Sequence, residues 1–220
     1  LVVCHVAGHG SKPQSFDRLQ HFVHGALPST VMHGDRITID VRGGRPAPAI
    51  LDAVIDVRAD LVVTSTRGRT GLSKALLGSV ASALLCKSSV PVMVVPPTGT
   101  EIWSLTSLGS TPHVGRVVAA TDLTDASSRM LAWAGRVSCA SEEPLFVMHV
   151  VPEGTNDGPV RARLEACVRR LQTSHGARAI LRHGGVADVG LVVMGRNGKA
   201  PGAFAYELLR QGRSVVAMVP

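Results

Sequence analysis

The sequence predicts an α/β protein made of two tandem, doubly wound parallel-sheet domains with a Rossmann-like order of elements. First, Leu61–Val63 and Val92–Val95 are short, rich in β-branched residues and continuously apolar, as is typical of strands covered on both faces of a parallel sheet. Second, Ser79–Lys87 between them places its apolar residues on one helical face. Third, the same order of elements returns later in the chain. Such alternation indicates parallel strands joined by right-handed crossovers.

Four further elements precede this unit. A strand is expected at Leu1–Val6, an amphipathic helix at Ser15–Leu27, a second strand at Arg36–Val41 and a helix at Ala47–Arg58. A turn rich in glycine leads through Pro46 into that last helix, because proline suits the first helical position. Ile50, Val54 and Val57 of this helix are expected to face the sheet.

A loop rich in glycine and arginine connects the strand at 61–63 to the helix at 79–87. A helix N-terminus offers unpaired backbone N–H groups and partial positive charge, so Gly78 followed by the Ser79 hydroxyl suits a bound phosphate. Two glycines let the backbone approach a ligand, and two arginines add anion-binding side chains; these are Gly68, Gly71, Arg67 and Arg69. The same glycines would equally serve a loop that only turns, and the residue pattern leaves both interpretations open.

Prolines and glycines then interrupt the pattern, which predicts a domain at 1–97, a linker at 98–113 and a second domain at 114–220. In the second domain, Leu145–Val150 mirrors Leu1–Val6, Asp188–Gly195 mirrors Asp60–Ser65, and Val216–Pro220 mirrors Val92–Pro96. This domain opens with an extra strand from Arg116, followed by Asp122 and by a helix start that Thr124 or Asp125 would cap. The first repeat of the sequence has no counterpart of that opening strand.

The spacing of the glycine loop carries a resemblance to a known family. The loop contains Ser65, then Gly68 after two intervening residues, and then Gly78-Ser79 after nine more, and a helix and the strand PVMVV follow it. This spacing resembles the Gly-x2-Gly-x9-Gly-Ser/Thr signature of the universal stress protein family. In the nucleotide-binding members of that family, this loop holds the ribose and phosphates of ATP. Ser65 departs from the pattern, because the family has a glycine there and a Cβ would approach the ribose.

The resemblance covers nearly the whole chain and implies the adenine nucleotide alpha hydrolase-like form of the doubly wound fold. It implies a stress-response regulator that binds ATP or a related adenine nucleotide, with or without Mg²⁺, and hydrolyses it slowly at most. The residues that it assigns to nucleotide binding come from both repeats: Val6, Thr64, Ser65, Arg67, Gly68, Gly78, Ser79 and Val80 from the first, and Asp122, Val150, Gly195 and Gly198 from the second. Asp122 would approach the adenine.

The second repeat is shorter than the first. His5 to Pro96 spans 91 positions, whereas His149 to Pro220 spans 71. The helix expected between His183 and Asp188 is absent, although a parallel crossover needs about a dozen residues. We therefore expect that segments are missing from the sequence, including part of the second glycine loop, where Ala203 also lacks the hydroxyl of Ser79.

Composition limits the other classes of function. The net charge of +7 allows an acidic partner, but only 3% of the residues are aromatic, which disfavours stacking on single-stranded nucleic acid. The densest basic group, Arg161, Arg163, Arg169 and Arg170, is expected to be a solvated helix face. Four scattered cysteines indicate core thiols in a reducing compartment, and no apolar run suits a membrane span, so we expect a cytoplasmic protein without metal ligands.

Two alternatives stay open at this point. The protein would bind an adenine nucleotide, or it would be a dimerisation and interaction scaffold whose loops serve folding alone. Each repeat ends in a hydrophobic strand, and pairing these terminal strands within one chain or in a homodimer would cover edges that otherwise template aggregation. His5 and His149 occupy equivalent strand positions and are interpreted as structural histidines, because no partner set for catalysis accompanies them.

Overall fold

The computed structural model describes residues 1–8, 12–26, 37–66, 77–96, 115–125, 127–151, 156–181, 189–196, 202–212 and 214–220. They form two compact units, Leu1–Asp60 and Leu61–Pro220, each of which is described by itself. The predicted domain limits on either side of a linker stay a prediction, since residues 97–114 lie outside the described ranges.

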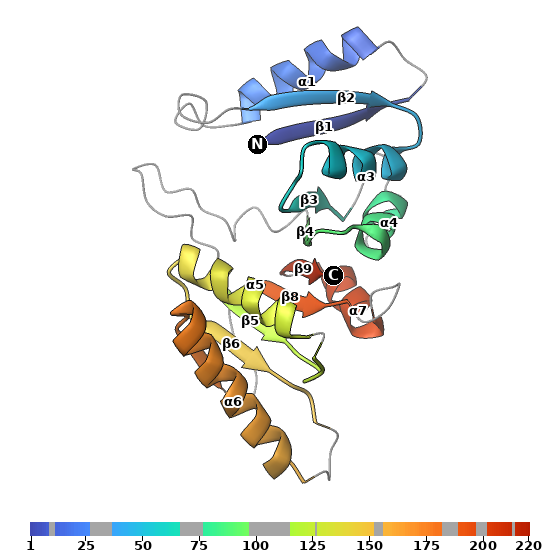
Figure 1. Ribbon diagram of the computed structural model, residues 1–220. Helices are drawn as coiled ribbons and strands as arrows, with labels where there is room; N and C mark the ends of the chain where they lie inside the picture. The colour runs from blue at the N-terminus through green and yellow to red at the C-terminus, as the bar shows by residue number, and fades with distance from the viewer. Residues whose placement is uncertain are drawn as a thin grey trace. The chain divides into compact units, whose positions relative to one another are not determined.

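The first unit is a two-stranded parallel sheet with one helix on each face (Figure 1). Its elements are β1 (Val2–Ala7), α1 (Lys12–Ala26), β2 (Thr38–Gly43) and α3 (Pro46–Asp56). All four correspond to predicted elements, and α3 begins at Pro46, one residue before the predicted start at Ala47. Val54 is buried as predicted, but Val57 is 42% exposed. Val57 is the C-cap of this helix, one residue beyond its last helical residue, Asp56.

The second unit contains a seven-stranded sheet in the order β3-β4-β9-β8-β5-β6-β7. Its strands are β3 (Val62–Ser65), β4 (Val92–Val95), β5 (Arg116–Ala120), β6 (Leu145–Met148), β7 (Ala179–Leu181), β8 (Val189–Gly195) and β9 (Val215–Val219). Its helices are α4 (Ser79–Lys87), α5 (Ser127–Ala140), α6 (Gly158–His175) and α7 (Ala203–Gln211). Every neighbouring pair is parallel except β4 and β9.

The strands of the second repeat form a complete doubly wound sheet. The chain runs from β5 to β6 and β7 on one side, and then to β8 and β9 on the other side. Apolar side chains of one sheet face, including Val117, Leu145 and Leu191, pack against Met130 of α5 and Leu164 of α6. This arrangement confirms the predicted α/β class with parallel strands, and it places the reversal of strand order at β5.

The first repeat departs from the predicted single sheet. Its strands are divided between the β1–β2 sheet and the β3–β4 edge of the larger sheet. Within the described residues, no strand pairs with both the β1–β2 sheet and β3, so β3 is an edge strand. Val63 of β3 is 61% exposed, which corrects the expectation that this strand is covered on both faces.

The two terminal strands pair with each other inside the chain. β4 and β9 are antiparallel, with Met93 opposite Ala217. Their remaining edges pair with β3 and β8, so both edges of both strands are occupied. The expected covering of these edges is therefore confirmed within one chain. The predicted homodimer stays a prediction, and it would have to use a surface other than these strand edges.

Equivalent positions of the two repeats meet around this junction. The Thr66 amide donates to the Val95 carbonyl after β3, and the Arg196 amide donates to the Val219 carbonyl after β8. Ser82 of α4 and Tyr206 of α7 each follow their N-cap glycine by four residues, and their hydroxyl oxygens lie 3.4 Å apart. This local two-fold relation is what a repeated unit paired through its last strands would produce.

The four cysteines were predicted to be core residues. All four are free thiols, but Cys139 is exposed and the other three are only partly buried, so the prediction is wrong for Cys139. The thiol of Cys139 contacts the His175 carbonyl at the end of α6. Within the described ranges, every helix is too short or too polar to cross a membrane.

The guanidinium of Arg196 caps the C-terminus of α4. Its Nη1 donates to the carbonyls of Leu85 and Cys86, at 3.2 and 2.9 Å. Arg196→Met should lower the free energy of unfolding by about 1.5 kcal/mol, because two partly buried carbonyls lose a charged donor. Thermal and urea unfolding measure this change. Arg210→Met, which removes an exposed surface pair with Glu207, is the matched control and should change little; equal effects of the two substitutions would contradict the capping role.

The pKa of the Cys4 thiol is raised by burial and by the adjacent Asp40 carboxylate, which lies opposite it on β2. A raised thiol pKa means less thiolate at a given pH, and removal of Asp40 removes one cause of the increase. Asp40→Asn should therefore speed alkylation of Cys4 by iodoacetamide at mildly alkaline pH, measured by peptide mass spectrometry. The exposed Cys139 is the internal control, and an unchanged Cys4 rate would refute the assignment.

Candidate functional site

The candidate site of the second repeat lies where the strand order reverses. Thr121 and Asp122 follow β5, His149 and Val150 follow β6, and Gly195 ends β8. These three strands are parallel neighbours, so their carboxyl ends lie at one edge of the sheet. In open α/β sheets, ligands bind in the crevice at this switch point. The sequence predictions of Asp122, Val150 and Gly195 thus converge on one place.

The loop after β5 is held by local hydrogen bonds in which its side chains bind its own backbone and each other. The Asp122 Oδ1 accepts bonds from the Thr124 amide at 3.0 Å, from the Thr124 hydroxyl and from the Ser127 hydroxyl. The Thr121 hydroxyl accepts the Leu123 amide at 3.0 Å. Leu123 has a φ of 61°, a left-handed conformation that costs a non-glycine residue about 1–3 kcal/mol. The surrounding hydrogen bonds keep the loop in this strained form.

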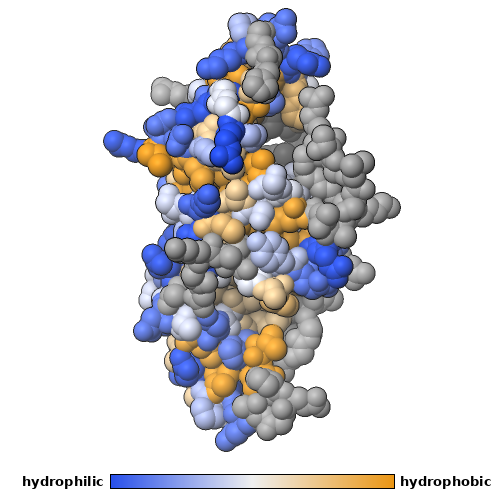
Figure 2. Space-filling model, turned by 90° about the vertical axis from the view of Figure 1, so that its right-hand side faces the viewer, coloured by the Kyte–Doolittle hydropathy of each residue, from blue (hydrophilic) through white to orange (hydrophobic). Residues whose placement is uncertain are grey.

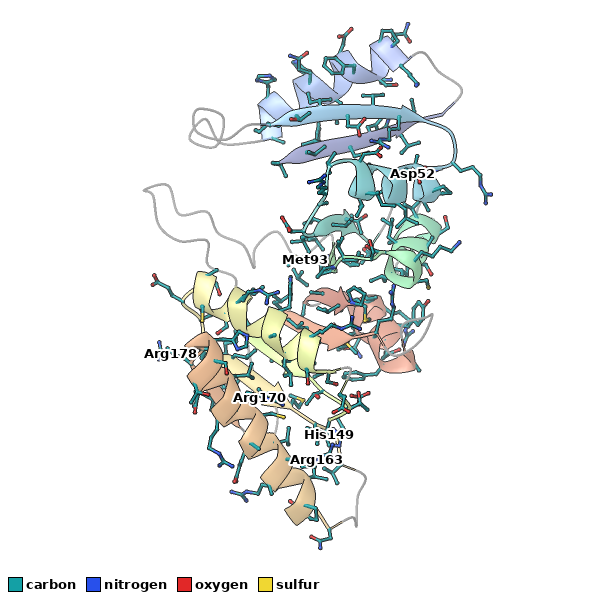
Figure 3. The ribbon with its side chains drawn as sticks, in the orientation of Figure 1. Asp52, Met93, His149, Arg163, Arg170 and Arg178 are labelled. Atoms are coloured by element: carbon teal, nitrogen blue, oxygen red, sulfur yellow. The ribbon has the colours of Figure 1, made fainter. Side chains whose placement is uncertain are left out.

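Two residues from other elements fix the same loop. The Nδ1 of His149 lies 2.7 Å from the Thr121 carbonyl, and Arg163 of α6 donates from Nη2 to the Leu123 carbonyl. Both His149 and Arg163 are labelled in Figure 3. Because a carbonyl only accepts, Nδ1 must carry the proton, which leaves Nε2 of neutral His149 as an acceptor. This contact supports the interpretation of His149 as a structural histidine, because its ring holds the Thr121 carbonyl of the loop.

A pocket of about 630 Å³ opens between these strand ends and α7. This volume is within the usual range for small-molecule sites. Its lining residues are Val118, Ala120, Thr121, Asp122, Ser127, Met148, His149, Val150, Val189, Val192, Met194, Gly195, Phe204, Leu208 and Ser214. Figure 2 views the side toward which the arrowheads of β6 and β8 point in Figure 1, and apolar and polar side chains alternate over it.

The polar groups of this lining gather at one end. Thr121, Asp122, Ser127 and His149 surround the strand ends, while valine, methionine, phenylalanine and leucine line the remainder apart from Ser214. Asp122 is the charged residue of this lining, and the described part of it contains no lysine or arginine. A Cβ added to Gly195 would meet Met130 at 3.7 Å, which is ordinary contact, so packing does not demand glycine there.

The candidate site of the first repeat is the N-terminus of α4. Gly78 is the N-cap, and no side chain caps the helix. The Gly78 amide donates to the Thr66 carbonyl at 2.8 Å, which brings both ends of the glycine loop together. The first backbone bond within this helix runs from the Ser82 amide to the Gly78 carbonyl. The amides of Ser79, Val80 and Ala81 therefore precede the helical ladder, as an anion site requires.

The structure tests the predicted residues unevenly. Thr64 and Ser65 are the last residues of β3, which pairs with β4, and Ser79 and Val80 are in the first turn of α4. Val6 belongs to the first unit and is described apart from them. Arg67, Gly68 and Gly198 lie outside the described residues.

Several site residues were missed by the sequence analysis. Arg163 is exposed, as expected of a solvated face, but it also donates to the Leu123 carbonyl, which was not expected. A helical wheel places Arg163 beside other arginines and gives no sign of this long-range contact. Phe204 and Leu208 line the pocket from α7, and their one-turn spacing was the available signal.

Comparisons with known proteins agree with this architecture. Residues 11–96 match the sequence profile of the universal stress protein family. The stress response protein NhaX of Bacillus subtilis is 39% identical over 57 residues, which are 26% of this chain and 34% of that protein. A universal stress protein of Methanocaldococcus jannaschii is 40% identical over 62 residues, 28% of this chain and 36% of that protein. The aligned segments thus span about a third of the length of these curated relatives.

Whole-chain similarity appears at the level of structure. The crystal structure of a universal stress protein from Archaeoglobus fulgidus matches with a TM-score of 0.64 at 20% identity, covering 99% of this chain and 84% of that one. The fold is therefore that of a tandem α/β protein with parallel sheets. The sequence match to the universal stress protein family thus covers residues 11–96, and the similarity over the whole chain is one of fold.

Arg163 should contribute measurably to stability through the strained loop. Arg163→Met removes the charged donor from the carbonyl of the buried Leu123, so the free energy of unfolding should fall by about 1–2 kcal/mol. Arg170→Met on the same helix is the control, because Arg170 is exposed and lies 3.9 Å from the Cys167 sulfur. Chemical denaturation distinguishes the two variants, and an Arg163→Met variant as stable as Arg170→Met would show that the contact contributes nothing.

Proposed function

We propose that this protein is a cytoplasmic stress-response regulator that binds ATP or a related adenine nucleotide. The observation that carries the proposal is the pocket at the switch point of the second repeat, where Thr121, Asp122, Val150 and Gly195 converge. Crevices at this point of a doubly wound sheet are the usual nucleotide sites of such folds. The match of residues 11–96 to the universal stress protein family supports the same ligand class.

The acceptor groups of the pocket suit a nucleoside. The Asp122 carboxylate can accept from an exocyclic amine or a ribose hydroxyl, and His149 Nε2 adds a second acceptor. Apolar side chains such as Val150 and Met194 offer contact to a base. The absence of cations among the described lining residues means that phosphates would extend toward a helix N-terminus instead of lying beside Asp122.

Two helix N-termini are available for phosphates. α4 begins after Gly78 and α7 begins after Gly202, and neither has a side-chain cap. Ser79 adds a hydroxyl at the first position, whereas Ala203 does not. The proposal therefore gives the first repeat the stronger phosphate contacts and the second repeat the better-formed pocket.

Any hydrolysis should be slow. The described residues contain no group of three or more histidine, cysteine, aspartate or glutamate side chains that could hold a metal ion. Mg²⁺ would then arrive with the nucleotide and be held chiefly by phosphate oxygens, as is usual for this ion. Binding would act by shifting a conformational equilibrium through different affinities for its two states.

The phosphate contacts are tested by placing a carboxylate at each helix start. Gly78 and Gly202 both have extended backbone at the N-cap, a position that aspartate occupies readily. Gly78→Asp should weaken ATP binding at least tenfold, measured by isothermal titration calorimetry, because the new charge faces the phosphates. Gly202→Asp is the matched variant and should have the smaller effect.

Thermal stability of the same variants shows whether a loss of ATP binding comes from a loss of folding. An N-cap aspartate satisfies an unpaired helix amide, so neither variant should lose thermal stability. Weaker ATP binding at an unchanged melting temperature would support the phosphate role. ATP affinity that stays unchanged in both variants, or wild-type protein that gives no heat with ATP, would contradict the proposed function.

A scaffold without nucleotide is the alternative, and two observations favour it. Ser65 stands where the family pattern has glycine, and the described pocket lining offers no cation to a triphosphate. Mass spectrometry of small molecules released on denaturation separates the two functions. Adenine nucleotide at about one per chain would exclude the scaffold, whereas empty protein that also ignores ATP would favour it.

A further inference from the structure

The outer face of α6 carries a surplus of positive charge. The helix contains four arginines and one acidic residue, Glu165. All four arginines are exposed, namely Arg161, Arg163, Arg169 and Arg170, and α6 runs along one side of the second unit (Figure 1). Glu165 pairs with Arg161, and one nitrogen of Arg163 donates to the Leu123 carbonyl. Within the described ranges, most guanidinium N–H groups of this face therefore have no protein acceptor.

The arginines lie on both sides of a stripe of small residues. At about 3.6 residues per turn, the exposed Ala162, Ala166 and Thr173 fall on one stripe of the helix. This stripe points away from Leu164 and Leu171, which are buried in the core. The arginines form one row on each side of it: Arg163 with Arg170, both labelled in Figure 3, and Arg161 with Arg169. The small side chains allow another surface to approach the helix between the two rows.

The dimensions of this face suit a groove of duplex DNA. An α-helix with its side chains is about 10–12 Å wide, and the major groove of B-DNA is about 12 Å wide. Each arginine row extends over about 10–12 Å of the helix axis, which is the rise of about three base pairs. With the small residues toward the groove, the two rows would face phosphates of the two strands. Guanidinium groups bind phosphate oxygens through forked, charge-assisted hydrogen bonds.

Other anionic partners suit this face less well. A helix that lies on a membrane surface inserts large apolar side chains, but those of α6 are buried in the core: Leu164, Val168 and Leu171. Single-stranded nucleic acids are held by stacking on aromatic side chains, and α6 contains no phenylalanine, tyrosine or tryptophan. A duplex needs neither feature, because its backbone presents rows of phosphates at fixed spacing.

The sheet topology keeps this face clear of the segment expected to be missing after His183. β5, β6 and β7 follow one another in one direction across the sheet, with α5 and α6 in the crossovers between them. The chain must then return past β6 and β5 to reach β8. Because parallel crossovers are right-handed, a helix on the return path would cover the opposite face of the sheet.

We propose that the outer face of α6 binds double-stranded DNA through its phosphate backbone. The stripe of small residues would lie toward the major groove, and the two arginine rows would contact the two strands. Binding would have little sequence preference, since phosphate contacts carry no base information. DNA binding here is independent of the proposed nucleotide function, because α6 contributes no residue to the lining of the pocket.

Fluorescence anisotropy with a labelled duplex of about 20 base pairs measures this binding at several salt concentrations. Arg169→Gln/Arg170→Gln removes one arginine from each row without touching Arg163, whose contact with Leu123 supports the fold. This double variant should bind the duplex at least about tenfold more weakly than wild type at low salt. The slope of log affinity against log salt concentration should also fall by about 2, because each phosphate contact contributes about 0.9.

A second double variant controls for net charge. Arg18→Gln/Arg45→Gln removes the same charge from exposed positions of the first unit. It should weaken duplex binding by less than about threefold and leave the salt slope unchanged, because distant charges are screened. The melting temperatures of both double variants show whether each one is folded.

Four results would overturn DNA binding by this face. They are no binding of the duplex by wild-type protein at low salt, equal losses in the two double variants, equal affinity for a single strand of the same length, and tighter binding to phosphatidylserine–phosphatidylcholine vesicles than to the duplex. The last result would assign the arginines to a membrane surface instead. None of these measurements involves ATP, so the DNA site can fail while the nucleotide site stands, and the reverse also holds.

Discussion

The antiparallel pairing of β4 with β9 is the interaction on which the second unit depends. A strand whose edge is unpaired must leave its backbone groups to water or to another chain. Here the last strand of each repeat supplies the other with a partner, with Val94 opposite Val216. Seven strands become one sheet, and the helices α4 and α7 are brought close enough for Ser82 and Tyr206 to meet. The two candidate phosphate sites are consequently parts of one body.

Arg196 shows how closely the repeats are joined. It follows Gly195, which ends β8 and lines the pocket. Its guanidinium donates hydrogen bonds to two carbonyls at the C-terminus of α4. The opposite end of α4 is the N-terminus at Gly78. The second repeat therefore fixes the C-terminal end of the helix whose N-terminus is the candidate phosphate site of the first repeat.

The loop after β5 illustrates where prediction from sequence fails. Asp122 at the carboxyl end of a strand was identified through the family resemblance, whereas its hydrogen bonds with the Thr124 amide and the Ser127 hydroxyl were not predicted. The left-handed Leu123 gave no signal, since leucine rarely adopts that conformation and local propensity argues against it. Its conformation depends on Arg163, which is 40 residues away and was assigned to a solvated face. Contacts over such separations are decided by packing and leave no periodic pattern.

The sequence by itself determined the α/β class, the repeat and most strands and helices, because apolar periodicity and turn residues act over short distances. It also determined which residues stand at strand ends, and hence that Asp122, Val150 and Gly195 would share an edge. The tertiary structure alone decided that the first repeat is divided between two sheets and that Val63 is exposed. It alone decided the irregular register between β5 and β8 at Val189, which lines the pocket. Strand partners and register are long-range choices, so they follow from the whole fold and not from any one segment.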